Sequence, residues 1–542
     1  MRDSTYQDFI LKNIPRIITQ IDRDEHSTTY GSCDRSHWHL KIRDFTSAIL
    51  QQTGLALAIL YNENFVGNIY YKNQNIKNWA EATVVYWSKI QLNDGSFNEY
   101  YPYEHGFPPT AFSLYSACEV YKRLFMNDNS LLDKFKKTAK YLISHIEEKA
   151  FNQEIASITA LYSLYTIIKE KWILDGIEPK LCRILEFQST EGWFPEYGGA
   201  DLGYLSVALD MLTEYYVMSH DKRVEIPIHK VVGFIKYFVH PDLTVGGEYG
   251  SRNTTYFLPN GIEVASQLGN SDSAGIKKHL FSDTDQYNYF MDSVDDRYFS
   301  HYLMHSYLRA LEKEQRCQLR TQIDKLPCNE FHDKYFPESG LISFNNGTYF
   351  AVASLKKGGV LKVYHQGKEI FIDCGYRVNY GKGCVAATNW LDQSYKITYE
   401  NQNAKVDGMM SMVPLKVSTP ILHIGLRYVA FLFGNRIITL LKKKMIFVDK
   451  HSDIYFSRKV EFGDQIITIT DNLSSPQPVT IEKASNMSLR HVASGKFFMR
   501  SDLLSSSIVY KDVTNIKITT TFNSQNEQVD TSYTCSLTRK TE

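Results

Sequence analysis

The sequence has no excess of either charge, and this restricts the classes of partner. Its 60 Lys and Arg side chains balance 60 Asp and Glu side chains over 542 residues. A protein that binds nucleic acid, or coats an anionic membrane, usually carries a basic excess. The composition as a whole therefore argues against both.

Cysteine and cofactor motifs are also missing. The eight cysteines are scattered without a Cys-x-x-Cys spacing, so neither a disulfide framework nor a cysteine-based zinc site is expected. His37 and His39, and likewise His301 and His305, have spacings that can hold a metal, but neither pair has convincing further ligands. No Gly-x-Gly-x-x-Gly or phosphate-binding loop is present. We expect no metal and no cofactor.

Long apolar runs are absent as well. No stretch of about 18 apolar residues exists, so the sequence predicts no membrane span. The first residues lack a basic region followed by an apolar core, which predicts no signal peptide and a cytoplasmic location.

Aromatic residues and a repeated phrase are abundant by contrast. There are 37 Tyr and 30 Phe, and the phrase Gln91–Tyr100 recurs as Gln188–Tyr197, with a third echo at Gly247–Tyr249. The first two share Gln, an acid, Gly, Phe, Glu and Tyr in order. A period of about 50 residues, with one interval doubled, is typical of stacked helical hairpins. Loops that emerge on one face of such a ring would together build a pocket.

The chain divides near residue 330. From 45 to about 325, apolar residues recur at helical spacing; afterwards β-branched and aromatic residues alternate with polar ones. We predict an α+β multidomain protein with an N-terminal extension (1–44) packing on an (α/α) toroid (45–328), followed by an antiparallel β-sandwich (329–542). Expected strands include 437–449, 465–471 and 478–483.

Several stretches resemble the heparinase II/III-like polysaccharide lyases, in which an α/α toroid precedes a β-sandwich. The loop 94–103 is similar to a family loop whose last Tyr is catalytic, which implies Tyr103. Asn152, at the start of a helix, resembles the family's Asn. Tyr204 follows Asn152 by 52 residues, close to the family's Asn-to-Tyr spacing, so it competes with Tyr103. The stretch 362–376 resembles a sandwich segment that ends in Asp-x-Gly.

One departure from the family is serious. A His-x-His-x-Asp signature, which supplies a catalytic His, should precede that sandwich segment, but Leu355–Val360 contains no His. Either another His acts, or the chemistry differs, or the protein binds without cutting.

The resemblance implies a lyase that removes the C5 proton of a uronic acid and expels the sugar linked at C4. The substrate carboxylate must be neutralised by hydrogen bonds, and a base and an acid must move protons. We assign Asn152 to the carboxylate, Arg252 to the carboxylate or to tuning a Tyr, Tyr204 and Tyr103 to base and acid, and His105 as their partner. The predicted substrate-binding residues are Glu99, Glu196, Asp201, Glu248, Tyr249, Asn253, Trp38 and His39.

Other functions remain open at this level. The same first step serves a C5-epimerase in surface-polysaccharide biosynthesis. Two carboxylates among Glu99, Glu196, Asp201 and Glu248 would serve a toroid glycoside hydrolase, and a non-catalytic carbohydrate-binding protein would need no chemistry. Asn152 would then be only a helix N-cap. The expected partner in each case is a polysaccharide or oligosaccharide, anionic for the lyase.

Overall fold

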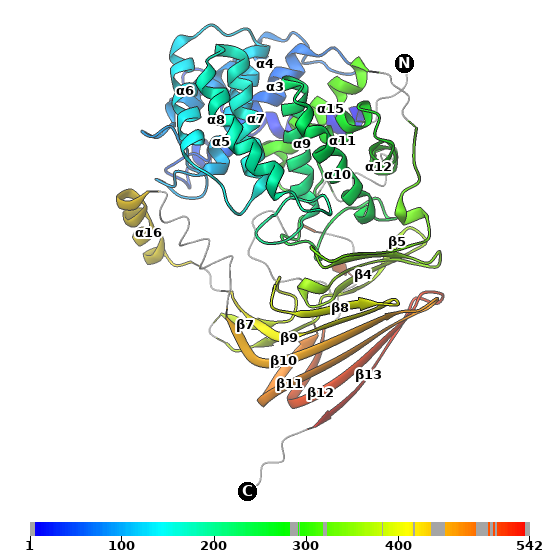
Figure 1. The fold of residues 1–542 in the computed structure, drawn as a ribbon. Coiled ribbons are helices and arrows are strands. Elements are labelled where there is room, and N and C mark those ends of the chain that lie inside the picture. Colours follow the sequence, from blue (N-terminus) through cyan, green and yellow to red (C-terminus); the bar gives the residue numbers. More distant parts are fainter. Residues whose placement is uncertain are drawn as a thin grey trace.

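The computed structural model describes residues 6–281, 291, 293–317, 322–381, 383–415, 418–434, 450–483, 497–498, 502–503 and 507–536. Helices fill the N-terminal part and antiparallel strands the C-terminal part, one stacked on the other (Figure 1). The predicted α+β fold, a helical toroid followed by a β-sandwich, is confirmed. The expected strand 437–449 lies outside the described residues.

Six inner helices form a closed ring. Each packs against the next, and the last returns to the first. Their bounds are α3 (Thr53–Asn62), α5 (Phe107–Arg123), α7 (Phe151–Ile168), α9 (Leu202–Ser219), α11 (Asn260–Gln267) and α15 (Met304–Arg316). Helices α3, α7 and α9 are apolar around most of their circumference, and such helices are stable only when they are surrounded by protein.

An outer layer of helices covers this ring, and most of them bury a single apolar stripe. They are α1 (Gln7–Ile18), α4 (Gln74–Lys89), α6 (Asn129–Ser144), α8 (Lys171–Phe187), α10 (Glu225–Ile235) and α12 (Ser271–Phe281). Shorter pieces are α2 (Arg35–Trp38), α14 (Asp296–Tyr298) and a π-helix (Phe299–Leu303). Helix α1 packs on α15, so part of the N-terminal extension contacts the ring.

The strands form two antiparallel sheets. The first has the order β1-β2-β3-β4-β5 and the second β10-β9-β7-β6-β11-β12-β13, with β8 paired to β9. The first comprises β1 (His332–Phe336), β2 (Leu341–Asn345), β3 (Phe350–Ser354), β4 (Val360–His365) and β5 (Lys368–Asp373). The second comprises β6 (Tyr376–Asn379), β7 (Cys384–Ala387), β8 (Lys396–Glu400), β9 (Asn403–Pro414), β10 (His451–Phe462), β11 (Ile466–Lys483), β12 (Ile508–Asn523) and β13 (Gln528–Ser536).

One sequence-based expectation for this region was wrong, and one helix was missed. The segments 465–471 and 478–483 are one long strand, β11, whose register against β12 shifts between Ser474 and Ile481. Beyond β9, the chain also forms a helix that was not predicted, α16 (Pro420–Phe433).

The first sheet joins the two parts of the molecule. Because side chains alternate along a strand, Phe350 and Val352 pack into the toroid core, whereas Ala351 and Ala353 pack into the sandwich core. The toroid's loops are thus fixed against this sheet. None of the helices in the described ranges is long and apolar enough to cross a bilayer.

Candidate active site

The two copies of the repeated phrase are equivalent turns. Gly95 and Gly192 both have positive φ, 94° and 108°. A Cβ atom at Gly95 would lie 2.4 Å from the Lys137 carbonyl oxygen on α6, and one at Gly192 would lie 2.2 Å from the Lys230 carbonyl oxygen on α10. Glycine is therefore required in both turns. The first turn is followed by Glu99 and the second by Glu196, the glutamate that the two phrases share.

Glu196 lies at the centre of a buried polar group. The side-chain amide of Asn152, in the first turn of α7, donates a hydrogen bond to Glu196 Oε2. Ala150 is the N-cap of that helix, so the Asn152 side chain does not serve as the cap. Glu196 Oε1 has no hydrogen-bond partner among the described residues. Burial raises the pKa of Glu196 to about 8, although Arg252 and Asn152 act to lower it.

Arg252 is the cation of this group. Its guanidinium carbon lies 4.1 Å from the centroid of the Tyr197 ring, and it interacts electrostatically with Tyr204 and Glu196. Its Nε and Nη1 atoms are buried and have no hydrogen-bond partner within the described part of the chain. Buried polar atoms are nearly always satisfied in folded proteins, so unpaired donors beside an unpaired carboxyl oxygen mark a place for a ligand.

Asp201 positions this group and does not extend it. Its side chain accepts hydrogen bonds from the backbone N–H of Tyr204 at 3.1 Å and of Arg252 at 2.8 Å, and from the Thr254 hydroxyl. It therefore caps α9 and holds the Arg252 loop against it. A role in shaping the loop fits these contacts better than the predicted substrate contact.

A lysine occupies the sandwich segment Leu355–Val360, in which the sequence resemblance led us to expect a histidine. Lys357 is buried, and its Nζ donates to the Gly250 carbonyl at 2.9 Å, to the Glu248 carbonyl and to Asn253 Oδ1. The sandwich thus also fixes the Arg252 loop, in addition to Asp201.

Replacing Lys357 by Met should remove all three of these bonds and let the loop move. A displacement of about 1 Å of a positioning group can lower a rate by about 100-fold, so we expect a loss of this order in kcat/KM. The matched control is Lys356→Met, since the Lys356 side chain donates to the Glu338 carbonyl and, among the described residues, makes no hydrogen bond to the Arg252 loop. Equal rates for the two variants would show that Lys357 does not position the loop.

Tyr204 stands between Arg252 and a group of buried tyrosines. It is half-buried, and its ring centroid lies 6.0 Å from that of Tyr256. The Tyr256 and Tyr302 hydroxyls share a hydrogen bond, and Tyr298 stacks on Tyr256 at 5.9 Å. Burial raises the pKa of Tyr256 and of Tyr302 well above the usual value. These hydroxyls therefore stay protonated.

The other two repeated glutamates are already paired with cations. Glu99 accepts a bond of 2.6 Å from Arg297, and Glu248 one of 3.0 Å from Lys362. Tyr100, next to Glu99, interacts electrostatically with Tyr204. The loops of the repeated phrases therefore meet on one rim, but among these three glutamates only Glu196 lacks an ion-pair hydrogen bond in the described structure.

Tyr103 and His105 lie elsewhere. Tyr103 is exposed, and its ring contacts Phe431 of α16 at 5.2 Å. His105 Nδ1 lies 2.6 Å from Asp94 Oδ2. Burial alone would raise the pKa of Asp94, but hydrogen bonds from His105 and Ser96 lower it to about 2. The structure thus places Tyr103 and His105 against α16 and the turn, and not in the Glu196 group.

Three further predicted residues also lie apart from the Glu196 group. The Tyr249 hydroxyl lies 2.9 Å from His240 Nε2 at the seam between toroid and sandwich. The Trp38 indole N–H donates to the Gln20 carbonyl at 2.8 Å, and His39 is exposed beside it. These contacts give Tyr249 and Trp38 structural partners.

His301 was not predicted for the site, although its buried environment resembles that of the site residues. It lies in the π-helix, an element frequent at functional sites, and its ring contacts those of Tyr298 and Tyr302. Neither of its ring nitrogens has a hydrogen-bond partner among the described residues. From the sequence, only the spacing between His301 and His305 is visible. That spacing does not reveal that the His301 ring is buried, or that its nitrogens have no hydrogen-bond partner among the described residues.

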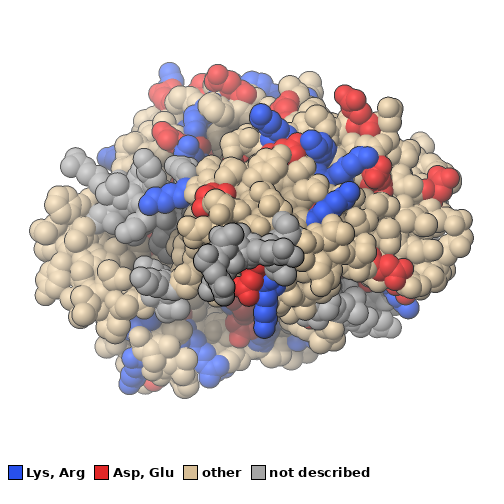
Figure 2. Space-filling model, turned by 90° about the horizontal axis from the view of Figure 1, so that it is seen from below, with Lys and Arg blue, Asp and Glu red and all other residues tan. Residues whose placement is uncertain are grey.

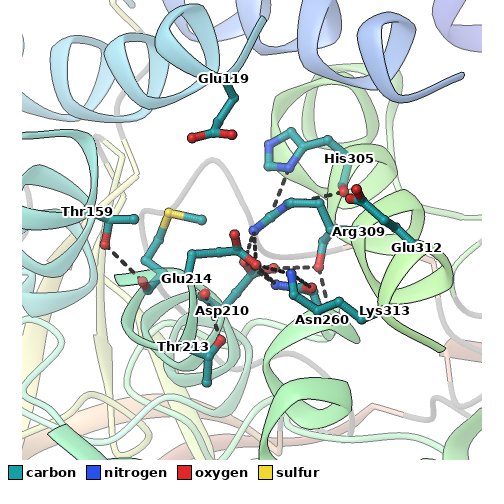
Figure 3. Close-up of polar contacts among 12 residues, drawn as sticks. Glu119, Thr159, Asp210, Thr213, Glu214, Asn260, His305, Arg309, Glu312 and Lys313 are labelled. Atoms are coloured by element: carbon teal, nitrogen blue, oxygen red, sulfur yellow. Dashed lines mark hydrogen bonds and ion pairs between the residues drawn. The ribbon is translucent and has the colours of Figure 1, made fainter. Parts of the chain in front are cut away.

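The structure contains a second buried network of charged side chains, which differs from the Glu196 group because its ions are paired. Inside the ring, Arg309 Nη1 lies 2.7 Å from Asp210 Oδ1, and Glu214 receives bonds from Asn260 and Lys313 (Figure 3). These contacts join α9, α11 and α15. The network therefore stabilises the ring. Within the described ranges, no group of three or more His, Cys, Asp or Glu side chains could hold a metal ion.

The sequence matches no known family and no curated protein. Among solved structures, the chondroitin AC lyase of Streptomyces coelicolor A3, in complex with chondroitin sulphate, has a TM-score of 0.57 at 9% identity, over 98% of this chain and 76% of that one. Heparinase III gives 0.46 at 12% identity, over 98% and 87%. Cellobiose 2-epimerase of Bacillus thermoamylovorans B4167 gives 0.43 at 11% identity, over 57% and 100%. The chain has the fold of this chondroitin AC lyase.

Proposed function

We propose that the chain is a polysaccharide lyase that cleaves a uronate-containing polysaccharide by β-elimination. The observation that carries this proposal is the buried group of Asn152, Glu196 and Arg252, whose unpaired polar atoms lie beside Tyr204. The fold is consistent with it, but toroids support several chemistries, so the function rests on the residues.

The polar group suits the carboxylate of a uronic acid. Arg252 offers two unpaired N–H donors. Glu196, whose pKa burial raises to about 8, is protonated at neutral pH and can donate a hydrogen bond from its free oxygen. A carboxylate held by these donors loses much of its charge, and the proton on the neighbouring C5 becomes more acidic.

Tyr204 is placed to move the proton. The positive charge of Arg252 can stabilise the negative charge that a Tyr204 oxygen carries when it acts as a base. Tyr204 takes the C5 proton, the C5–H electron pair forms a C4=C5 double bond, and the C4–O bond breaks. The Tyr204 hydroxyl then protonates the departing oxygen, so one residue serves as base and acid.

Hydrolysis is less well supported by the geometry. A glycosidase requires two carboxyl groups that flank the bond. Asp201 accepts hydrogen bonds from α9 and from the Arg252 loop, and Glu99 and Glu248 are paired with Arg297 and Lys362. Of these four, Glu196 alone has a buried oxygen without a hydrogen-bond partner in the described structure.

A panel of uronate polymers tests the proposal. A lyase gives an unsaturated product that absorbs in the ultraviolet. An epimerase gives none but takes up solvent deuterium at C5, and a hydrolase gives reducing ends without absorbance. A protein that only binds sugar would retain polymer and release nothing. Any result other than an unsaturated product would contradict the lyase proposal.

Glu196→Gln should change the pH profile. In the wild type, activity should fall as the pH rises through about 8, because Glu196 ionises there and repels the substrate carboxylate. Glutamine cannot ionise, so the variant should keep activity at neutral pH and lose this alkaline limb. The measurement is kcat/KM from pH 6 to 10. An unchanged alkaline limb in the variant would show that another group causes it.

A further inference from the structure

Helix α16 exposes most of its apolar side chains. Ile421 is 81% exposed and Leu432 is 69% exposed, and only Ala430 is buried. The other large apolar side chains that are exposed on this helix are Leu422, Ile424, Tyr428, Val429, Phe431 and Phe433. A contiguous apolar surface of this kind on a folded protein marks a binding site.

Apart from Phe431, whose ring also contacts Tyr103, the exposed residues lie on the side of α16 that faces away from the protein. With 3.6 residues per turn, they span an arc of about 200° of the helix circumference. The opposite side carries the buried Ala430 and the half-buried Leu426, together with His423 and Arg427. An ordinary surface helix buries most of its apolar side chains, whereas α16 leaves most of them exposed.

Two contacts fix this orientation. Arg427 Nη1 and Nη2 form ion-pair hydrogen bonds of 2.5 and 2.9 Å with the two carboxylate oxygens of Asp44. The ring centroids of Phe431 and Tyr103 lie 5.2 Å apart. Helix α16 stands at the side of the molecule, away from the body of the sandwich (Figure 1). On the face seen in Figure 2, the left end of the molecule shows few acidic or basic side chains.

The segment next to this attachment adds positive charge and further apolar side chains. Leu40 and Ile42 are 56% and 73% exposed. Both acids of the segment already pair with arginine, Asp34 with Arg43 and Asp44 with Arg427. The remaining charged side chains of segment 34–44, Arg35 and Lys41, give a local positive surplus that the neutral total charge conceals.

We propose that α16 and residues 35–43 together form a face that binds an anionic phospholipid surface. A folded protein partner would cover one side of α16, whereas an arc of about 200° suits the lipid interface, which surrounds an inserted helix. The positive surplus next to it complements anionic headgroups. This proposal does not depend on the lyase reaction.

Co-sedimentation of the full chain with vesicles tests the proposal. The wild type should bind vesicles of phosphatidylcholine with phosphatidylglycerol more tightly than vesicles of phosphatidylcholine alone, and salt should weaken the binding. The double variant Ile421→Ser, Leu432→Ser should lower the partition coefficient by at least about tenfold. Lys41→Glu should lower binding to the anionic vesicles by about fivefold or more.

The matched control is Phe125→Ser, Ile226→Ser, which removes two exposed apolar side chains outside this face and should bind like the wild type. Hydrogen exchange of the wild type gives a second measurement, since anionic vesicles should protect the amides of α16. The proposal is overturned if the wild type does not bind, if both double variants bind equally, or if α16 mediates a dimer in light scattering without binding vesicles.

Discussion

Tyr204→Phe should lower kcat/KM by about 1,000-fold, because it removes the one group that serves as both base and acid. Phenylalanine keeps the ring contact with Tyr256, so the fold should be unchanged. The measurement is the initial rate of unsaturated product on the polymer identified by the panel, together with KM, which should change little because the carboxylate contacts remain.

Tyr103→Phe is the control for this prediction. Tyr103 matches the family's catalytic tyrosine by local motif, but its ring lies against Phe431 of α16. We expect its variant to keep most of the wild-type rate. A large loss in Tyr103→Phe with an active Tyr204→Phe would reverse the assignment.

Of the substitutions proposed here, Arg309→Met should lower the free energy of unfolding the most. It leaves Asp210 buried without its ion pair and removes one cation near Glu214. An uncompensated buried charge costs about 3–5 kcal/mol. Urea unfolding followed by far-ultraviolet circular dichroism should therefore show the helical transition at a clearly lower urea concentration.

An exposed ion pair provides the comparison. Lys459→Met breaks the surface pair with Glu461, 2.7 Å in length, and should change the free energy of unfolding by less than about 1 kcal/mol. Adding Asp210→Asn to Arg309→Met should recover part of the loss, because it removes the unpaired charge. Equal effects of the buried and the exposed variants would contradict the role of the network.

The fold could be predicted from the sequence because apolar and polar residues recur with clear helical or strand periodicity in its main elements. Helices such as α4 and α6 combine helical periodicity with a polar N-cap, Asn73 or Asp128. The failures have physical reasons. Residues 474–478 contain serines and Pro478, which suggest a break, yet β11 continues through them with shifted register. The helix α16 was missed because its apolar run is not amphipathic in the ordinary sense.

The residues of the candidate site could be predicted from the sequence only in part. The spacing between Asn152 and Tyr204, and the turn at Arg252, selected residues that the structure brings close together. The motif around Tyr103 and His105 matched equally well. Both residues have positive φ, 61° and 54°, and the direction that this gives the loop cannot be derived from the residue types.

The structure of Tyr204→Phe with a bound uronate oligosaccharide tests the account most directly. We predict that a sugar carboxylate lies within hydrogen-bond distance of Arg252, Asn152 and Glu196, with its C5 atom facing residue 204. A sugar that binds at another surface, or one whose carboxylate points to solvent while Glu196 and Arg252 stay unpaired, would contradict the account.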